Sequence, residues 1–140
     1  MSRKLIDECE DGNLEEAKQR ILNGEDVNMI DFLDCTPLYI GSHKGHLEIV
    51  KVLIASGALL DKANNNGETP LYEASSRVHL EIVKVLIDAG ALLDKADKYS
   101  WTPLYIAIKN GHLEIVKVLI ASGKLLDIAD NNGWTPLYIA

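Results

Sequence analysis

Three histidines at one fixed spacing are the first candidates for chemistry in this chain. His46, His79 and His112 recur at a constant interval, and imidazole is a frequent metal ligand. Equivalent residues in packed neighbouring units lie about 8–10 Å apart, whereas each ligand of a zinc ion lies about 2.0–2.1 Å from the metal. The three rings therefore cannot share one ion, and we predict no metal site. We expect each histidine instead to help cap the helix that follows it.

Other reactive side chains are no better placed. Asp61, Asp94 and Asp127 have the same period, so they lie too far apart for a general acid–base pair, and we expect them to accept backbone hydrogen bonds. Cys35 is close to His43 in sequence, but no third group that would orient such a pair is evident. The glycines stand singly and form no phosphate-binding loop. We therefore predict no enzyme activity and no cofactor.

The period itself predicts the architecture that positions these residues. Thr-Pro-Leu-Tyr occurs at Thr36, Thr69, Thr102 and Thr135, with the same interval as the histidines. A fixed period in the range of roughly 20–50 residues is typical of a stacked repeat array. One unit is too small to bury its own apolar face, so it folds only against its neighbours. Function is then expected on the surface that repetition builds.

Each unit contains signals for two helices and a turn. In residues 31–63, Thr36 can cap a helix that begins with proline, and Gly45 can end that helix in the left-handed conformation. We predict a first helix over 37–44 and a second, apolar helix beginning at Leu47. Asn65-Asn66-Gly67 predicts a tight turn in the segment that returns to the next unit.

These motifs resemble the ankyrin repeat. The resemblance rests on the Thr-Pro-Leu helix start, on the pairs Gly45-His46 and Gly111-His112, and on the Leu-Glu-Ile-Val-Lys helix. It covers the whole chain and implies an all-α solenoid of stacked helix-turn-helix pairs with extended β-turn loops. We expect one domain over 1–140, made of an N-terminal capping repeat (1–30), three full repeats (31–63, 64–96 and 97–129) and a partial terminal repeat (130–140).

The chain departs from the family pattern at several positions. Tyrosine replaces the family's histidine in every Thr-Pro-Leu motif, and because a buried tyrosine hydroxyl needs a partner, we expect an altered hydrogen bond between repeats. Asp34 and Ser100 replace the turn glycine. Val78 replaces the glycine between the two helices, so either the backbone rearranges there or the site is strained by a positive φ.

The chain ends at Ala140, inside the first helix of the last unit. We expect a fragment or a truncated array in which the outer face of the helix over 113–121 is partly bare. This predicts end-to-end self-association through that face.

The composition argues against several partners and locations. The net charge of −7 opposes nucleic-acid binding, which needs clustered Lys and Arg, and it also disfavours anionic membranes. No stretch approaches the roughly 20 apolar residues that span a bilayer, and the acidic start does not resemble a signal peptide. Cys9 and Cys35 do not recur with the repeat, so we interpret them as free thiols in a reducing compartment. We predict a cytoplasmic protein, with the nucleus as the alternative.

The resemblance implies a non-catalytic module that binds a partner protein through a concave face. That face would be formed by the turn tips and the short first helices, where the repeats differ most from one another. The candidate contact residues are Phe32, Leu33, Cys35, Ile40, His43, Lys44, Glu68, Glu73, Arg77, Tyr99, Trp101, Ile106, Lys109 and Trp134.

Two questions about this function stay open in the sequence. Trp101 and Trp134 occupy equivalent positions, and each is either an anchor for the partner or a lid folded on its own repeat. The chain as a whole is either a binding module or, alternatively, a structural spacer or an engineered scaffold. The irregular Val78, Asp34 and Ser100 argue against deliberate idealisation.

Overall fold

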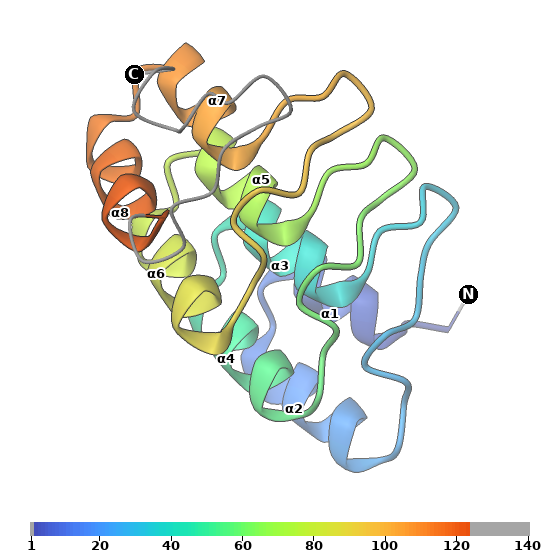
Figure 1. The fold of residues 1–140 in the computed structure, drawn as a ribbon. Helices are drawn as coiled ribbons and strands as arrows, with labels where there is room; N and C mark the ends of the chain where they lie inside the picture. The colour runs from blue at the N-terminus through green and yellow to red at the C-terminus, as the bar shows by residue number, and fades with distance from the viewer. Residues whose placement is uncertain (1, 124–140) are drawn as a thin grey trace.

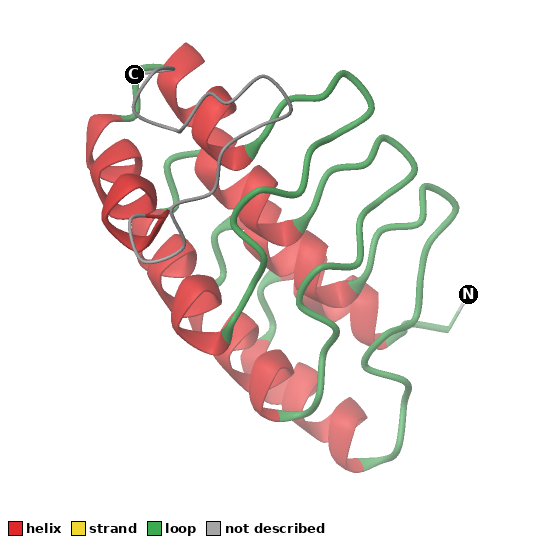
Figure 2. Cartoon of the chain, in the orientation of Figure 1, coloured by secondary structure: helices red, strands yellow, loops and turns green. Residues whose placement is uncertain are grey.

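The computed structural model describes residues 2–123. Within that range all regular secondary structure is α-helix, and loops connect the helices (Figure 2). The eight helices of this part are α1 (Leu5–Asp11), α2 (Leu14–Leu22), α3 (Pro37–Lys44), α4 (Leu47–Ala55), α5 (Pro70–Ser76), α6 (Leu80–Ala89), α7 (Pro103–Lys109) and α8 (Leu113–Gly123). The partial repeat over 130–140, with Trp134 and Tyr138, lies outside the described residues, as does Asp127.

The helices form two layers that run the length of the array. Figure 1 shows α1, α3, α5 and α7 side by side in one layer and α2, α4, α6 and α8 in the other. The loops that lead into α3, α5 and α7 project together on the same side of the molecule. This arrangement confirms the predicted all-α array of helix pairs.

The helix starts follow from the repeated Thr-Pro. Thr36 Oγ1 accepts a hydrogen bond of 3.1 Å from the backbone N–H of Tyr39, and the equivalent threonines cap α5 and α7 at the same distance. Proline occupies the first turn, where its missing N–H costs nothing. Gly45 ends α3 with φ 81°, as the sequence predicts.

The core lies between the two layers and repeats with the sequence. Each copy of Leu-Glu-Ile-Val-Lys-Val-Leu-Ile buries its first isoleucine, its first valine and its second leucine. In α4 these are Ile49, Val50 and Leu53. The leucines of the three described Thr-Pro-Leu motifs, Leu38, Leu71 and Leu104, meet them from the first layer, and Leu38 is 1% exposed. These side chains form one continuous cluster through the described helices, so each repeat is stabilised by its neighbours.

Within residues 2–123, three residues other than glycine have positive φ. They are Asp34 (φ 63°), Val78 (φ 67°) and Ser100 (φ 68°), all at positions where the family pattern has glycine. Of the two alternatives for Val78, the structure shows the strained one. A β-branched residue in this region costs about 1–2 kcal/mol, and the Val78 side chain recovers little by burial because it is 56% exposed.

The N-terminal pair of helices is held by a buried carboxylate. Glu8 is 2% exposed and accepts hydrogen bonds from Arg3 Nη2 at 3.0 Å, Asn13 Nδ2 at 3.0 Å and Arg20 Nε at 2.7 Å. Arg20 also pairs with Glu25 at 3.0 Å. The hydrogen bonds from Arg3, then from Asn13 and Arg20, lower the pKa of Glu8 to about 2.

We predict that Val78→Gly raises the melting temperature, because glycine accepts a positive φ without strain. A gain of about 1 kcal/mol corresponds to roughly 2–4 °C for a domain of this size. The matched control is Gly45→Val, which introduces the same strain and brings a Cβ within 2.7 Å of His79 Cε1, so it should lower the melting temperature. Thermal melts followed by circular dichroism check both changes. A lower melting temperature for Val78→Gly would contradict the prediction.

We also predict that Glu8→Gln destabilises the protein in a pH-dependent way. The folded pKa of Glu8 is below its ordinary value of about 4.3, so its contribution is complete above about pH 5 and is lost as the pH falls toward 2. The variant should lose about 2 kcal/mol of unfolding free energy at pH 7, and the difference from the parent should shrink on acidification. Urea denaturation at pH 7 and at pH 3 measures it. A difference that is independent of pH would refute the assigned pKa.

Candidate partner-binding surface

The loop tips are held rigidly by side chain to backbone hydrogen bonds. Asp97 Oδ1 accepts from the backbone N–H of Tyr99 at 2.8 Å and of Trp101 at 3.0 Å. Asp31 and Asn64 make the same pair of bonds in the two preceding loops. Each tip therefore presents its exposed side chains from a fixed backbone.

Neighbouring tips are also bonded to each other. The N–H of Asn65 donates to the carbonyl of Leu33, and the N–H of Lys98 donates to the carbonyl of Asn66, both at 3.0 Å. At Gly67 a Cβ would lie 3.0 Å from the Cα of Asp97, so this glycine is needed for the close approach as well as for its φ of 78°. The three tips consequently form one continuous row, which together with the exposed residues of α3, α5 and α7 we call the tip surface.

A polar network joins the first two full repeats on this surface. The Tyr39 hydroxyl donates to Glu68 Oε1 at 3.3 Å, and His43 Nδ1 lies 2.7 Å from Glu73 Oε1, which also accepts from Arg77 Nε at 3.0 Å. Burial, followed by the charges of Glu73 and Glu68, raises the pKa of Tyr39, so its hydroxyl keeps its proton. The expected hydrogen bond between repeats is confirmed at Tyr39.

An aromatic cluster occupies the third full repeat. Trp101 lies 5.6 Å from Tyr99 and 5.3 Å from Tyr105 between ring centroids. Lys109 Nζ lies 3.9 Å above the Trp101 ring, and Lys98 Nζ lies 5.2 Å from the Tyr99 ring. Trp101 therefore packs on its own repeat, as a lid would, yet it stays partly exposed within an aromatic strip.

The candidate residues fall into three groups by burial. The sequence predicts that Cys35, Glu73 and Ile106 contact a partner. Their side chains are instead buried, at 4%, 5% and 7% exposure, and offer almost no accessible surface. Ile40, His43, Glu68 and Trp101 are half-buried. The exposed candidates are Phe32, Leu33, Lys44, Arg77, Tyr99 and Lys109. Trp134 lies outside the described residues.

Sequence reasoning missed one surface residue. Tyr105 is 36% exposed and completes the aromatic strip, although its equivalents Tyr39 and Tyr72 are buried at 7% and 4%. The pattern assigns all three tyrosines the same internal role, because they occupy the same place in the repeat. The signal in the sequence was Trp101, which lies four residues before Tyr105. The equivalent positions in the two preceding repeats hold no aromatic residue.

The rings of His46, His79 and His112 are directed toward the preceding repeat. His46 and His79 stand at the N-cap positions of α4 and α6, but neither side chain makes a capping hydrogen bond. His79 Nε2 instead lies 3.0 Å from the carbonyl oxygen of His43 in the preceding repeat, and His112 Nε2 lies 3.0 Å from that of Ser76. The prediction of a side-chain cap was wrong at His46 and His79, because the ring is directed toward the neighbouring repeat.

The aspartate prediction is confirmed at one of its three positions. Asp61 Oδ1 accepts from the backbone N–H of Leu92 at 2.9 Å, and Asn28 makes the equivalent bond to Leu59 at the same distance. By the period of the repeat, the backbone N–H that would donate to Asp94 belongs to Leu125, which lies beyond the described part of the chain. These bonds tie each extended return segment to the next one.

The remaining reactive groups are in unreactive surroundings. Cys9 and Cys35 are both free and buried, and burial raises the pKa of their thiols to about 12 and about 11. His43 is directed at Glu73, so it does not activate Cys35. Within residues 2–123, no group of three or more His, Cys, Asp or Glu side chains is arranged to hold a metal ion. None of the helices in that range has the length and apolar character needed to cross a membrane.

Comparison with known proteins agrees with this geometry. The sequence model of the family described as "Ankyrin repeats (3 copies)" matches residues 5–97 and again residues 91–140. No curated protein matches the sequence. Ankyrin repeats are generally protein–protein interaction modules and generally lack catalytic activity. Since the matched ranges cover far more than half of the chain and the helix pairs stack as that family requires, this protein belongs to the ankyrin repeat family.

Proposed function

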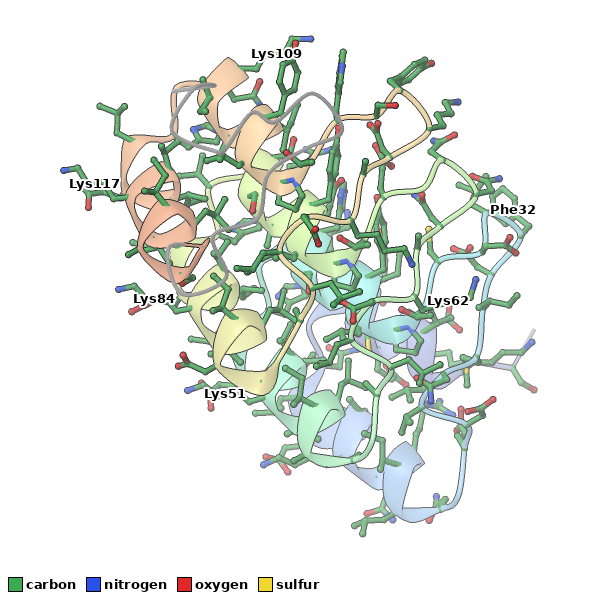
Figure 3. All side chains as sticks on the ribbon, viewed as in Figure 1. Phe32, Lys51, Lys62, Lys84, Lys109 and Lys117 are labelled. Atoms are coloured by element: carbon green, nitrogen blue, oxygen red, sulfur yellow. The ribbon has the colours of Figure 1, made fainter. Side chains whose placement is uncertain are left out.

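We propose that this chain is a non-catalytic module that binds a partner protein through its tip surface. The observation that carries the proposal is Phe32, the only phenylalanine in the chain, which is 90% exposed on a hydrogen-bonded tip. Figure 3 shows it at the end of the first projecting loop. Aromatic side chains are frequent anchors of protein interfaces, and the apolar Leu33 next to Phe32 is exposed as well.

The rigidity of the tips supports the same proposal. Leu33, next to Phe32, is 44% exposed, and Tyr99 two tips away is 63% exposed. The backbone at each tip is already fixed by its Asx hydrogen bonds and by its bond to the next tip. Little conformational entropy is therefore lost when a partner binds, and more of the contact energy remains as affinity.

The described helices of the opposite layer contain no aromatic residue. Each of α4, α6 and α8 carries a Glu–Lys pair three residues apart, at 3.3, 3.6 and 3.2 Å. Figure 3 shows Lys51, Lys84 and Lys117 along this layer, away from Phe32. Paired, identical charges in every repeat suit a face that remains in water, and such pairs contribute little energy.

We predict that Phe32→Ala combined with Tyr99→Ala abolishes partner capture without unfolding the protein. Both side chains are largely exposed, so the melting temperature should change by less than about 2 °C. Affinity capture from a native lysate with quantitative mass spectrometry would compare this variant with the parent. Lys51→Ala combined with Lys84→Ala is the matched control and should keep every captured protein. A parent chain that captures nothing, while its melt is cooperative, would instead support a structural spacer.

The variant Trp101→Ala distinguishes between the two roles considered for Trp101, an anchor for the partner and a lid on its own repeat. Because the indole packs against Tyr99 and Tyr105, we predict that the substitution destabilises the chain by about 1–2 kcal/mol, whereas Phe32→Ala, at a side chain that is 90% exposed, leaves stability unchanged. Urea denaturation measures this effect, and the same lysate capture, performed well below the melting temperature, measures binding. A loss of stability with full capture would make Trp101 a lid alone, and a loss of capture with unchanged stability would make it an anchor alone.

A further inference from the structure

We propose that one part of the tip surface recognises an acidic, extended peptide segment of the partner, in which carboxylates alternate with apolar side chains. This part consists of Lys98, Tyr99, Trp101, Tyr105 and Lys109, and we call it the third-repeat patch. The inference rests on the proposed function and gives the partner a chemical class.

The three rings supply a continuous apolar strip. Tyr99 belongs to the tip, Trp101 follows it in the same loop, and Tyr105 lies in the first turn of α7. Consecutive rings are 5.6 and 5.3 Å apart with interplanar angles of 44° and 33°, so they touch without stacking flat. Their outer surfaces are open, since Tyr99 is 63% and Tyr105 is 36% exposed. Such a strip can cover one or two apolar side chains of a peptide.

Two cations lie at this strip, and no carboxylate of the described residues forms an ion pair with either. Lys109 Nζ lies above Trp101, at 3.9 Å, and Figure 3 shows this side chain at the end of the array. Lys98 Nζ donates to the uncharged Asn66 Oδ1 at 2.9 Å. Neither forms an ion pair within residues 2–123, whereas Lys44 pairs with Glu10 at 3.1 Å and Arg77 with Glu73 at 3.0 Å. Both ammonium groups therefore keep donors for an incoming carboxylate.

The distribution of charge along the chain favours a negative partner here. The net charge of −7 arises mainly over positions 1–34, where Asp and Glu far outnumber Lys and Arg. Most of that charge lies on the first helix pair, and α1 is three packing steps from α7, or about 24–30 Å at usual helix packing distances. Screening acts over about 8 Å at physiological ionic strength, so the local potential is set by Lys98, Lys109 and the carboxylate of Asp97, which bonds to the N–H groups of Tyr99 and Trp101. The two cations outnumber this one anion. A carboxylate held beside this low-dielectric aromatic strip is attracted more strongly than in open water.

A nucleic acid fits these observations less well. Aromatic rings can stack on bases, but single-stranded nucleic acid binding also needs a basic groove that follows the backbone. The patch has two lysines, and the preceding tip presents the uncharged Asn65 and Asn66. A peptide in which carboxylates alternate with apolar residues matches a strip that has one cation beside Tyr99 and another over its central ring, Trp101.

The test uses Trp101 as its own reporter. The chain has two tryptophans, so a Trp134→Phe background leaves the indole of Trp101 as the only one. The probe is a synthetic eight-residue peptide that alternates Glu and Leu, and the matched peptides replace Glu by Gln or by Lys. Fluorescence titration at low salt should show saturable binding of the Glu peptide, at least tenfold weaker binding of the other two, and weakening as salt is raised.

Charge-matched variants locate the site. Lys98→Gln combined with Lys109→Gln should weaken binding of the Glu peptide at least tenfold, whereas Lys51→Gln combined with Lys84→Gln, which removes the same charge from the opposite layer, should leave it unchanged. Thermal melts establish that both variants fold. Equal binding of the Gln or Lys peptide, tighter binding of an eight-nucleotide oligothymidine, or an unaltered affinity in the Lys98/Lys109 variant would each overturn the inference.

The failure of this inference can be told apart from that of the proposed function. If the Glu peptide does not bind while lysate capture still depends on Phe32 and Tyr99, the tip surface binds a partner of another chemistry and only the acidic segment is refuted. If capture depends on no tip residue, the proposed function fails, and the inference fails with it.

Discussion

Burial of the apolar face between neighbouring repeats is the constraint on which the rest of the structure depends. One helix pair has two apolar sides and can cover neither by itself. In α4 the residues Ile49, Val50 and Leu53 are at most 2% exposed only because α2 and α6 lie on either side. The same three positions are buried in α6 and α8. The requirement to meet an identical neighbour explains why this helix barely changes between repeats.

Polar contacts between repeats then set the spacing that this packing permits. The histidine ring reaches a carbonyl of the preceding first helix, as His79 does with His43. Asp61 ties its return segment to the next one through Leu92, and the tips are joined by backbone hydrogen bonds. Because these contacts recur with the period of the sequence, each repeat meets its neighbour through the same kinds of polar bond. The register is thereby specified along both edges of the array, and the tips become one surface.

Variation is confined to places that this framework leaves free. The tips present Phe32 and Leu33, then Asn65 and Asn66, then Lys98 and Tyr99 on one repeated backbone. Asp34 and Ser100 keep the positive φ of the glycine they replace, so the turn survives the change of residue. A rigid row with a different side chain pair at each step can discriminate between partners without a pocket. For this reason the proposed partner contacts lie on the tips and first helices, and none lies on the second helices.

The sequence by itself determined the period, the helix starts at Thr-Pro, the end of α3 at Gly45 and the buried positions of the second helix, because each depends on local backbone chemistry or on a pattern that repeats. It could not decide which equivalent residues differ in environment. Tyr39 and Tyr72 are buried while Tyr105 is exposed, and Cys35 is buried on a loop whose tip is exposed. The histidine rings turn toward the preceding repeat instead of capping their own helix. Only the tertiary structure decided these points, since each depends on what the adjacent repeat places beside the residue, and a period in the sequence does not contain that information.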